Sequence, residues 1–209
     1  MKNKFVKIRF WTLAVLLVIV SCTGFTFENP LSEESVREAY FLGRSTDSEK
    51  LNRFLEQYVR HPKGTAVGPI SLRTPYDLAV LRALQNGNYN AQQAQIDYEA
   101  QRNLMAVSFS LYPHRPYPLP VMPTMGVGAA KNLEEVDQWN GFRFEVSQHG
   151  VIQAKASTSR PIYDKNEIIG AEIVLEFEVR QFASDRTKIQ IVTPEGEVVT
   201  AEFNLGKLK

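Results

Sequence analysis

Residues that could do chemistry are few in this sequence, and they stand far apart. The three histidines are His61, His114 and His149, each beside a proline or a glycine. No HExxH or HxH spacing accompanies them, so a zinc site would have to be assembled by the fold from distant residues. The G-x-S-x-G turn of many serine hydrolases is absent too, although serine triads also occur without it. The sequence therefore assigns no catalytic, cofactor-binding or metal-binding residue.

Acidic side chains alternate along one stretch near the C-terminus. Glu172, Glu176 and Glu178 would share one face of a strand, where they could receive a cation or a basic partner. The simpler interpretation is that these glutamates keep an exposed sheet face soluble, with Arg180 and Lys188 balancing their charge. We favour this second interpretation.

The single cysteine, Cys22, lies at the end of a segment of another kind. Four basic residues and no acidic one precede position 10, and an uncharged apolar run follows from Phe10 to Val20. A basic head, an apolar run of about 7–15 residues and a small residue at the cut are typical of a secretory signal peptide. The sequence therefore predicts an exported protein whose residues 1–21 are a signal peptide.

The end of this segment, Ile19-Val20-Ser21-Cys22, resembles the lipobox of bacterial lipoprotein precursors. The resemblance implies that the Cys22 sulfur receives a diacylglyceryl group, that the chain is cut just before it, and that the new amino group is acylated, for example with palmitate. Burial of acyl chains gains about 0.8 kcal/mol per CH₂, and two or three chains hold a protein stably on a bilayer. The expected membrane partner is thus reached through acyl chains on Cys22.

Two other fates of this segment stay open. The uncharged stretch from Phe10 to Phe27 has the length to span a bilayer as an uncleaved helix. Ordinary signal peptidase cleavage after Cys22 or Gly24 would instead release a soluble protein. Lipidation is favoured, because Cys22 is the only cysteine and the mature protein would then carry no free thiol and need no disulfide.

Charge narrows the expected partners and location. Removal of the four basic residues of the signal leaves 24 − 4 = 20 basic against 23 acidic residues, a net charge near −3. This balance excludes a typical nucleic-acid-binding protein.

The residue after Cys22 bears on which membrane holds the anchor. In lipoproteins, an Asp after the lipidated Cys can retain the protein at the inner membrane, and Thr23 stands there instead. We expect a lipid anchor on the cell membrane or the outer membrane, the latter favoured, facing the periplasm or the exterior.

The hydrophobic pattern after the signal predicts an α+β protein. We expect a tether over residues 22–30, a helical region over 31–104, a strand with a Pro-rich connector and loop over 105–140, and a β-sandwich region over 141–209. The layout is thus N-terminal helices followed by a C-terminal antiparallel β-sandwich, with an immunoglobulin-like variant by analogy only.

Within these regions, the start signals of four helices stand out. One is expected from Leu31 or Ser32 to Gly43, and another from a Thr46–Glu49 capping box through Val59. A third opens at Thr74 with a proline in its first turn, and a fourth covers 90–104 with an apolar face that includes Ile96 and Tyr98. The strands expected from alternation are 106–112, 142–147, 152–156, 162–163, 171–182, 188–192 and 198–203.

Residues 113–123 contain five prolines in eleven positions, so they exclude a helix or an inner strand. The segment would be either a stiff recognition element presenting Tyr117 and Leu119 or a connector along the surface. We favour the connector.

These observations favour a non-enzymatic envelope lipoprotein that needs no cofactor and serves binding, scaffolding or assembly, with another envelope protein as partner. Two alternatives stay open: a lipoprotein hydrolase whose site is assembled from distant residues, and a soluble periplasmic binding module.

Overall fold

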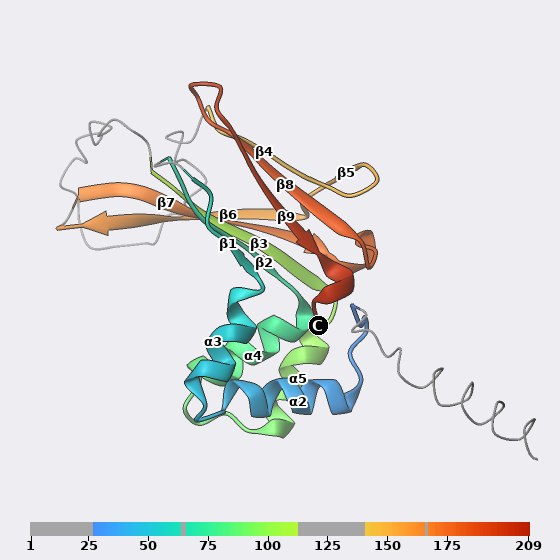
Figure 1. Cartoon of the computed structure of the whole chain (residues 1–209). Coiled ribbons are helices and arrows are strands. Elements are labelled where there is room, and N and C mark those ends of the chain that lie inside the picture. Colours follow the sequence, from blue (N-terminus) through green and yellow to red (C-terminus); the bar gives the residue numbers. More distant parts are fainter. Residues whose placement is uncertain (1–26, 64–65, 113–140, 166) are drawn as a thin grey trace, which may run out of the picture.

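The computed structural model describes residues 27–63, 66–112, 141–165 and 167–209. The signal, Cys22, and the Pro-rich segment 113–123 lie outside these residues. The described part of the chain contains four α-helices and two antiparallel sheets of five and four strands, which confirms the α+β class (Figure 1).

The larger sheet joins strands from both halves of the chain in the order β1-β2-β3-β7-β6. Its strands are β1 (Val59–Arg60), β2 (Val67–Arg73), β3 (Leu104–Leu111), β6 (Ala156–Asp164) and β7 (Glu167–Glu178). Val107, Phe109 and Leu111 alternate along β3 and are buried, as their spacing predicts. The region expected to be helical, 31–104, thus contributes two strands to a sheet that the prediction drew mainly from later residues.

The smaller sheet has the order β5-β4-β8-β9. Its strands are β4 (Arg143–Ser147), β5 (Val151–Ile152), β8 (Arg186–Val192) and β9 (Val198–Asn204). The predicted strands 188–192 and 198–203 are confirmed as β8 and β9, which pair with each other in antiparallel fashion. The predicted strand 152–156 is wrong, because β5 ends at Ile152 and Ala156 opens β6, which pairs with β7 of the larger sheet.

Buried side chains from the two sheets form a single hydrophobic cluster. It includes Phe109 and Ile173 of the larger sheet together with Ile191 and Phe203 of the smaller one. The ring centroids of Phe109 and Phe144 lie 4.9 Å apart across the two sheets. Burial of apolar surface from both sheets in one cluster is therefore the main source of stability for this half of the molecule.

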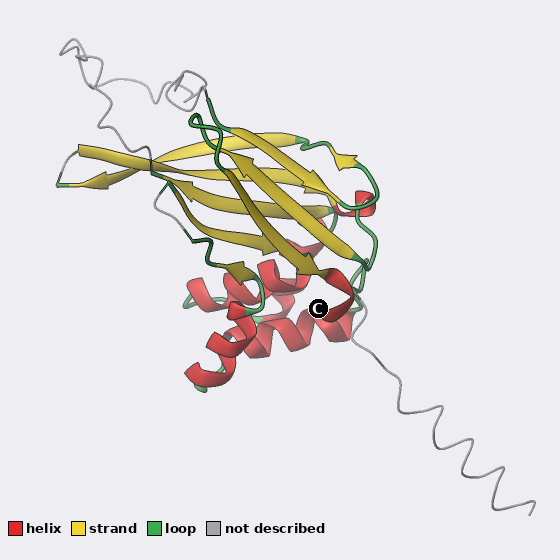
Figure 2. Ribbon diagram, turned by 45° about the horizontal axis from the view of Figure 1, so that its top comes forward, coloured by secondary structure: helices red, strands yellow, loops and turns green. Residues whose placement is uncertain are grey.

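Four helices gather at one end of the sheets (Figures 1 and 2). They are α2 (Glu33–Gly43), α3 (Ser48–Glu56), α4 (Pro75–Gln85) and α5 (Ala91–Gln101). Each begins with a side chain that accepts a backbone N–H bond: Ser32, Asp47, Thr74 and Asn90, respectively. Such caps satisfy N–H groups that have no partner inside the helix.

Four details of the helix predictions are wrong. The helix expected over 90–104 ends at Gln101, and Leu104 begins β3. Asp47, one residue later than expected, caps α3 in place of the Thr46–Glu49 box. That helix ends at Glu56, so Val59 begins a strand instead. On α5, Ala94 and Tyr98 are buried but Ile96 is 56% exposed, so the apolar face is narrower than its composition indicates. None of the described helices is long and apolar enough to cross a membrane.

The described part of the predicted tether lies against the folded body. Phe27 packs on the large hydrophobic cluster, and Leu31 is buried. The Leu31 N–H donates to the Tyr98 hydroxyl at 2.6 Å, and the Ser35 hydroxyl donates to Glu28 at the same distance. The folded body therefore begins by Phe27.

Candidate functional site

The two histidines that the structure describes, His61 and His149, do not form a metal site with other described residues. His61 is exposed after β1, and His149 lies in the β4–β5 turn with its Nε2 3.2 Å from the Asp185 carboxylate, both side chains being more than half exposed. His114 and Cys22 lie outside the described residues. In the part of the chain that the structure describes, no three His, Cys, Asp or Glu side chains lie close enough to hold a metal ion.

The three glutamates of β7 are half-buried, and Glu172 is the one of them that has polar register partners on both neighbouring strands. Glu172 lies between Ser110 of β3 and Arg160 of β6 in the strand register. Glu178 accepts from Arg180 at 2.6 Å, and Arg180 lies in a 3₁₀ turn, Val179–Gln181, rather than on the strand. Each end of this row of three glutamates thus has a guanidinium nearby, an arrangement suited to a solvated sheet face.

A groove that the sequence did not single out lies at the junction of α4 and α5. It is open to solvent, with a volume of about 470 Å³. Its lining residues carry amide, carboxylate or phenol groups, apart from one glycine: Gln85, Asn86, Gly87, Asn88, Tyr89, Gln93 and Asp97. Seven of the eleven residues 85–95 are Asn or Gln, and this composition is the signal that could have drawn attention to the segment.

Asp97 is the centre of the groove's hydrogen bonding. Its Oδ1 accepts from Gln93 Nε2 at 2.7 Å, and its Oδ2 accepts from the Tyr89 hydroxyl at 2.9 Å. These hydrogen bonds lower the pKa of the Asp97 carboxyl, because they favour its charged form. The bond from Gln93 has the larger effect. Burial, and after it the hydrogen bond to the Asp97 carboxylate, raises the pKa of the Tyr89 hydroxyl to about 12. At neutral pH the groove therefore holds a carboxylate beside a neutral phenol.

The loop between α4 and α5 is fixed by contacts at both ends. Asn86 Nδ2 donates to the Arg82 carbonyl at 2.9 Å, and the Tyr89 N–H donates to the Asn86 carbonyl at 3.2 Å. From α2, the Tyr40 hydroxyl donates to the Tyr89 carbonyl at 3.3 Å. The loop residues of the groove are thus held in place by contacts with α4 and α2.

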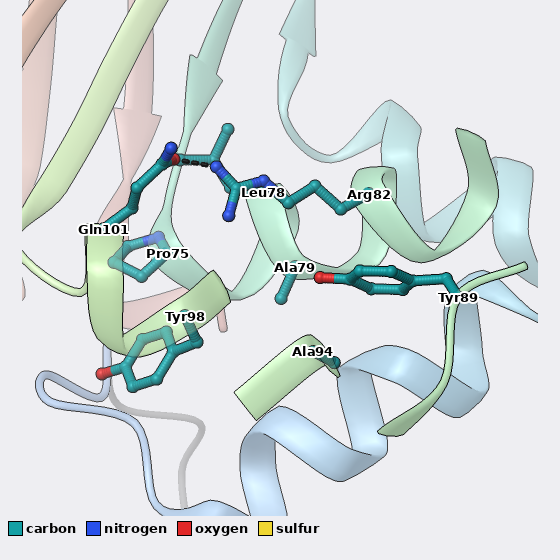
Figure 3. A pocket seen from close by; sticks show the side chains of 8 residues that line it. All are labelled: Pro75, Leu78, Ala79, Arg82, Tyr89, Ala94, Tyr98 and Gln101. Carbon is teal, nitrogen blue, oxygen red and sulfur yellow. Dashed lines mark hydrogen bonds between the residues drawn. The ribbon is translucent and has the colours of Figure 1, made fainter. Parts of the chain in front are cut away.

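A second, smaller hollow lies between α4 and α5, and Tyr89 is among its lining residues (Figure 3). Its volume of about 10 Å³ holds about one water molecule. Arg82 crosses it, with its guanidinium bonded to the Gln101 side chain and to the Asp97 carbonyl. This hollow is too small for an organic ligand, and the bonds of Arg82 to Gln101 and Asp97 hold α5 against α4.

A buried polar junction connects the helices to the sheets. Asp77 on α4 is fully buried, and its Oδ2 lies 3.0 Å from Arg73 Nη1 at the end of β2. Its other oxygen has no partner among the described residues. Burial raises the pKa of Asp77 to about 6, against the opposing effect of Arg73. Full burial puts this carboxylate out of reach of a ligand in solvent, so we assign it a structural role.

Tyr58 and Thr74 complete this junction by binding the backbone of Lys209. The hydroxyls of Tyr58 and Thr74 donate to the Lys209 carbonyl at 2.8 and 2.7 Å, and the Lys209 N–H donates to the Tyr58 hydroxyl at 3.2 Å. The Lys209 ammonium bonds Glu38 of α2 and lies over the Tyr76 ring. The end of β2, the start of α4 and the backbone of Lys209 are thereby joined at a single point.

We expect Tyr58→Phe to lower the free energy of unfolding by about 1–2 kcal/mol, because the Lys209 backbone loses a buried partner. Urea unfolding followed by circular dichroism measures the change. Tyr163→Phe is the matched control, since Tyr163 is 61% exposed and should change nothing measurable. Equal stability of the two variants would contradict the role given to Tyr58.

No family model, curated protein or solved structure matches this chain. Its function has to be argued from its own residues.

Proposed function

We propose that this protein is a lipid-anchored protein of the bacterial cell envelope with a non-catalytic binding, scaffolding or assembly role. The observation that carries the proposal is the lipobox-like sequence Ile19-Val20-Ser21-Cys22 at the end of a signal peptide. Two or three acyl chains at Cys22 would hold the protein stably on a bilayer.

The start of the folded body supports this arrangement. Phe27 packs on the large cluster and follows Cys22 by 27 − 22 = 5 residues. Five residues reach at most about 18 Å when fully extended. An anchor at Cys22 would therefore keep the body against the membrane surface rather than at the end of a long linker.

The core supports an exported body that has no disulfide. Cys22 is the only cysteine, so no internal disulfide can form, and the oxidising envelope offers no covalent reinforcement. Two buried clusters, one between the sheets and one among the helices, supply the apolar burial in its place.

We also infer that the two sheets face each other as a β-sandwich. The shared cluster and the Phe109–Phe144 contact support this, because facing sheets pack through the side chains of their inner faces. The immunoglobulin-like variant stays a prediction. In the proposed location, the outer membrane where the cell has one, the exposed body, with its polar groove at the α4–α5 junction, would meet another envelope component.

The proposal is tested by Cys22→Ala in an expressing bacterium. We expect loss of labelled palmitate and a shift of the protein from the membrane to the soluble fraction, because the acylated sulfur is gone. Thr26→Ala, which keeps Cys22, is the control and should stay labelled and membrane-bound. Unchanged labelling and fractionation of Cys22→Ala would overturn the anchor.

A further inference from the structure

We propose that the open groove at the α4–α5 junction, lined by Gln85, Asn86, Asn88, Tyr89, Gln93 and Asp97, binds a neutral saccharide. The inference specifies the ligand of the binding role proposed above. It rests on the groove and does not depend on Cys22.

The donors and acceptors of the groove suit a ligand rich in hydroxyl groups. Four carboxamides line it, and each offers an N–H₂ donor beside a carbonyl acceptor. A sugar hydroxyl also donates and accepts, so neighbouring hydroxyls of a sugar can bond both ends of one carboxamide. The Asp97 oxygens each have a lone pair beyond those used by Gln93 and Tyr89, and these can accept from further hydroxyls.

Other classes of ligand fit this lining poorly. No Lys or Arg lines the groove, and the nearby Arg44 guanidinium is bonded to the Asn86 carbonyl at 3.4 Å, so phosphate or another anion would find no cationic partner within the lining. Its one carboxylate is already bonded on both oxygens, whereas Ca²⁺ takes about 6–8 oxygen ligands, usually several of them carboxylates. No aliphatic side chain lines it, which disfavours a lipid or an apolar peptide.

The groove is organised before any ligand arrives. Gln93 and Asp97 lie one turn apart on α5 and are held together by their hydrogen bond, so neither side chain has to be ordered on binding. Tyr89 is half-buried, is bonded to Asp97 through its hydroxyl and lies 6.3 Å from the Tyr40 ring. Its aromatic body offers an apolar surface for the C–H face of a sugar ring. The volume of about 470 Å³ is within the range of small-ligand sites, about 300–1,000 Å³.

The test is a titration of the full chain, purified in detergent and labelled with ¹⁵N, with tetra-N-acetylchitotetraose and, in a second arm, with maltotetraose. We expect amide shifts confined to residues 85–97 in at least one arm, and none on addition of inorganic phosphate. The arm that binds more tightly identifies an N-acetylated or a plain glycan. Asp97→Ala should weaken binding at least about tenfold, because the central acceptor is lost and Gln93 and Tyr89 lose their common partner.

Gln92→Ala is the matched control, because Gln92 is an exposed glutamine of the same helix that does not line the groove. It should bind as the unmodified chain does, and an unchanged amide spectrum outside the groove shows that both variants are folded. Absence of shifts with both sugars, or equal affinity of Asp97→Ala and Gln92→Ala, would overturn the saccharide site. Neither outcome bears on the anchor, which Cys22→Ala tests separately.

Discussion

Replacing Gly43 with alanine is expected to lower the free energy of unfolding by about 3 kcal/mol, although the same change inside a helix is normally stabilising. An added Cβ would lie 2.3 Å from the Val80 carbonyl oxygen and 2.8 Å from the Ala83 Cβ. Both contacts are with α4, and the closest one is with backbone, which cannot rotate away. The methyl group would therefore force α2 and α4 apart and disturb the cluster that they share.

Urea unfolding measures this effect, with Gly87→Ala as the control. A Cβ at Gly87 would meet nothing within 4 Å, so that variant should stay within about 0.5 kcal/mol of the unmodified chain. An alanine at position 43 that leaves stability unchanged or raises it would mean that α2 and α4 do not cross as closely as described.

Elements with local signals were predicted well from the sequence. Thr74 caps a helix as predicted, and the helices that begin after Ser32 and Asn90 start where the pattern placed them, because a cap is a contact between residues two or three apart. Alternating apolar and polar residues likewise predicted β3 and β7, since one face of each strand lies on the core.

Elements set by distant contacts were missed or misplaced. The edge strand β6 is exposed over most of its length, so its sequence does not alternate, and only its pairing with β7 makes it a strand. The helical spacing before β1 runs on through Tyr58, but that side chain is buried against Lys209, 151 residues away. No local pattern contains such a contact.

The same distinction applies to the sites. The lipobox is a run of four neighbouring residues, so the sequence is enough to propose Cys22. The groove depends on a loop residue, Tyr89, reaching Asp97 on the following helix, and Asn and Gln are common on any solvated helix start. Only the fold shows that these side chains converge.

Asp77 should make the fold lose stability as the pH rises from about 4 to about 6. The pKa of its carboxyl is about 6 in the folded protein, against about 3.9 in an unfolded chain. Between these values the folded state binds the extra proton. The stabilisation is thus complete below the unfolded pKa and is lost as the pH rises through the folded one. A shift of this size corresponds to about 3 kcal/mol.

The measurement is urea unfolding at several pH values between 4 and 7, for the unmodified chain and for Asp77→Asn. This substitution keeps the shape of the side chain and removes its titration. Arg73 is 21% exposed, so water can solvate the guanidinium left without its carboxylate. We therefore expect Asp77→Asn to gain stability relative to the unmodified chain as the pH rises through this window.

Asp97→Asn is a control of opposite sign. The pKa of Asp97 is lowered by its bonds to Gln93 and Tyr89, so its contribution is present above its unfolded pKa and is lost as the pH falls. In measurements extended below pH 4, the stability of Asp97→Asn relative to the unmodified chain should therefore improve towards acid. That of Asp77→Asn should instead improve as the pH rises from about 4 to about 6. If the Asp77→Asn curve runs parallel to that of the unmodified chain, Asp77 has an ordinary pKa. Its burial against Arg73 would then carry no penalty for the charged form.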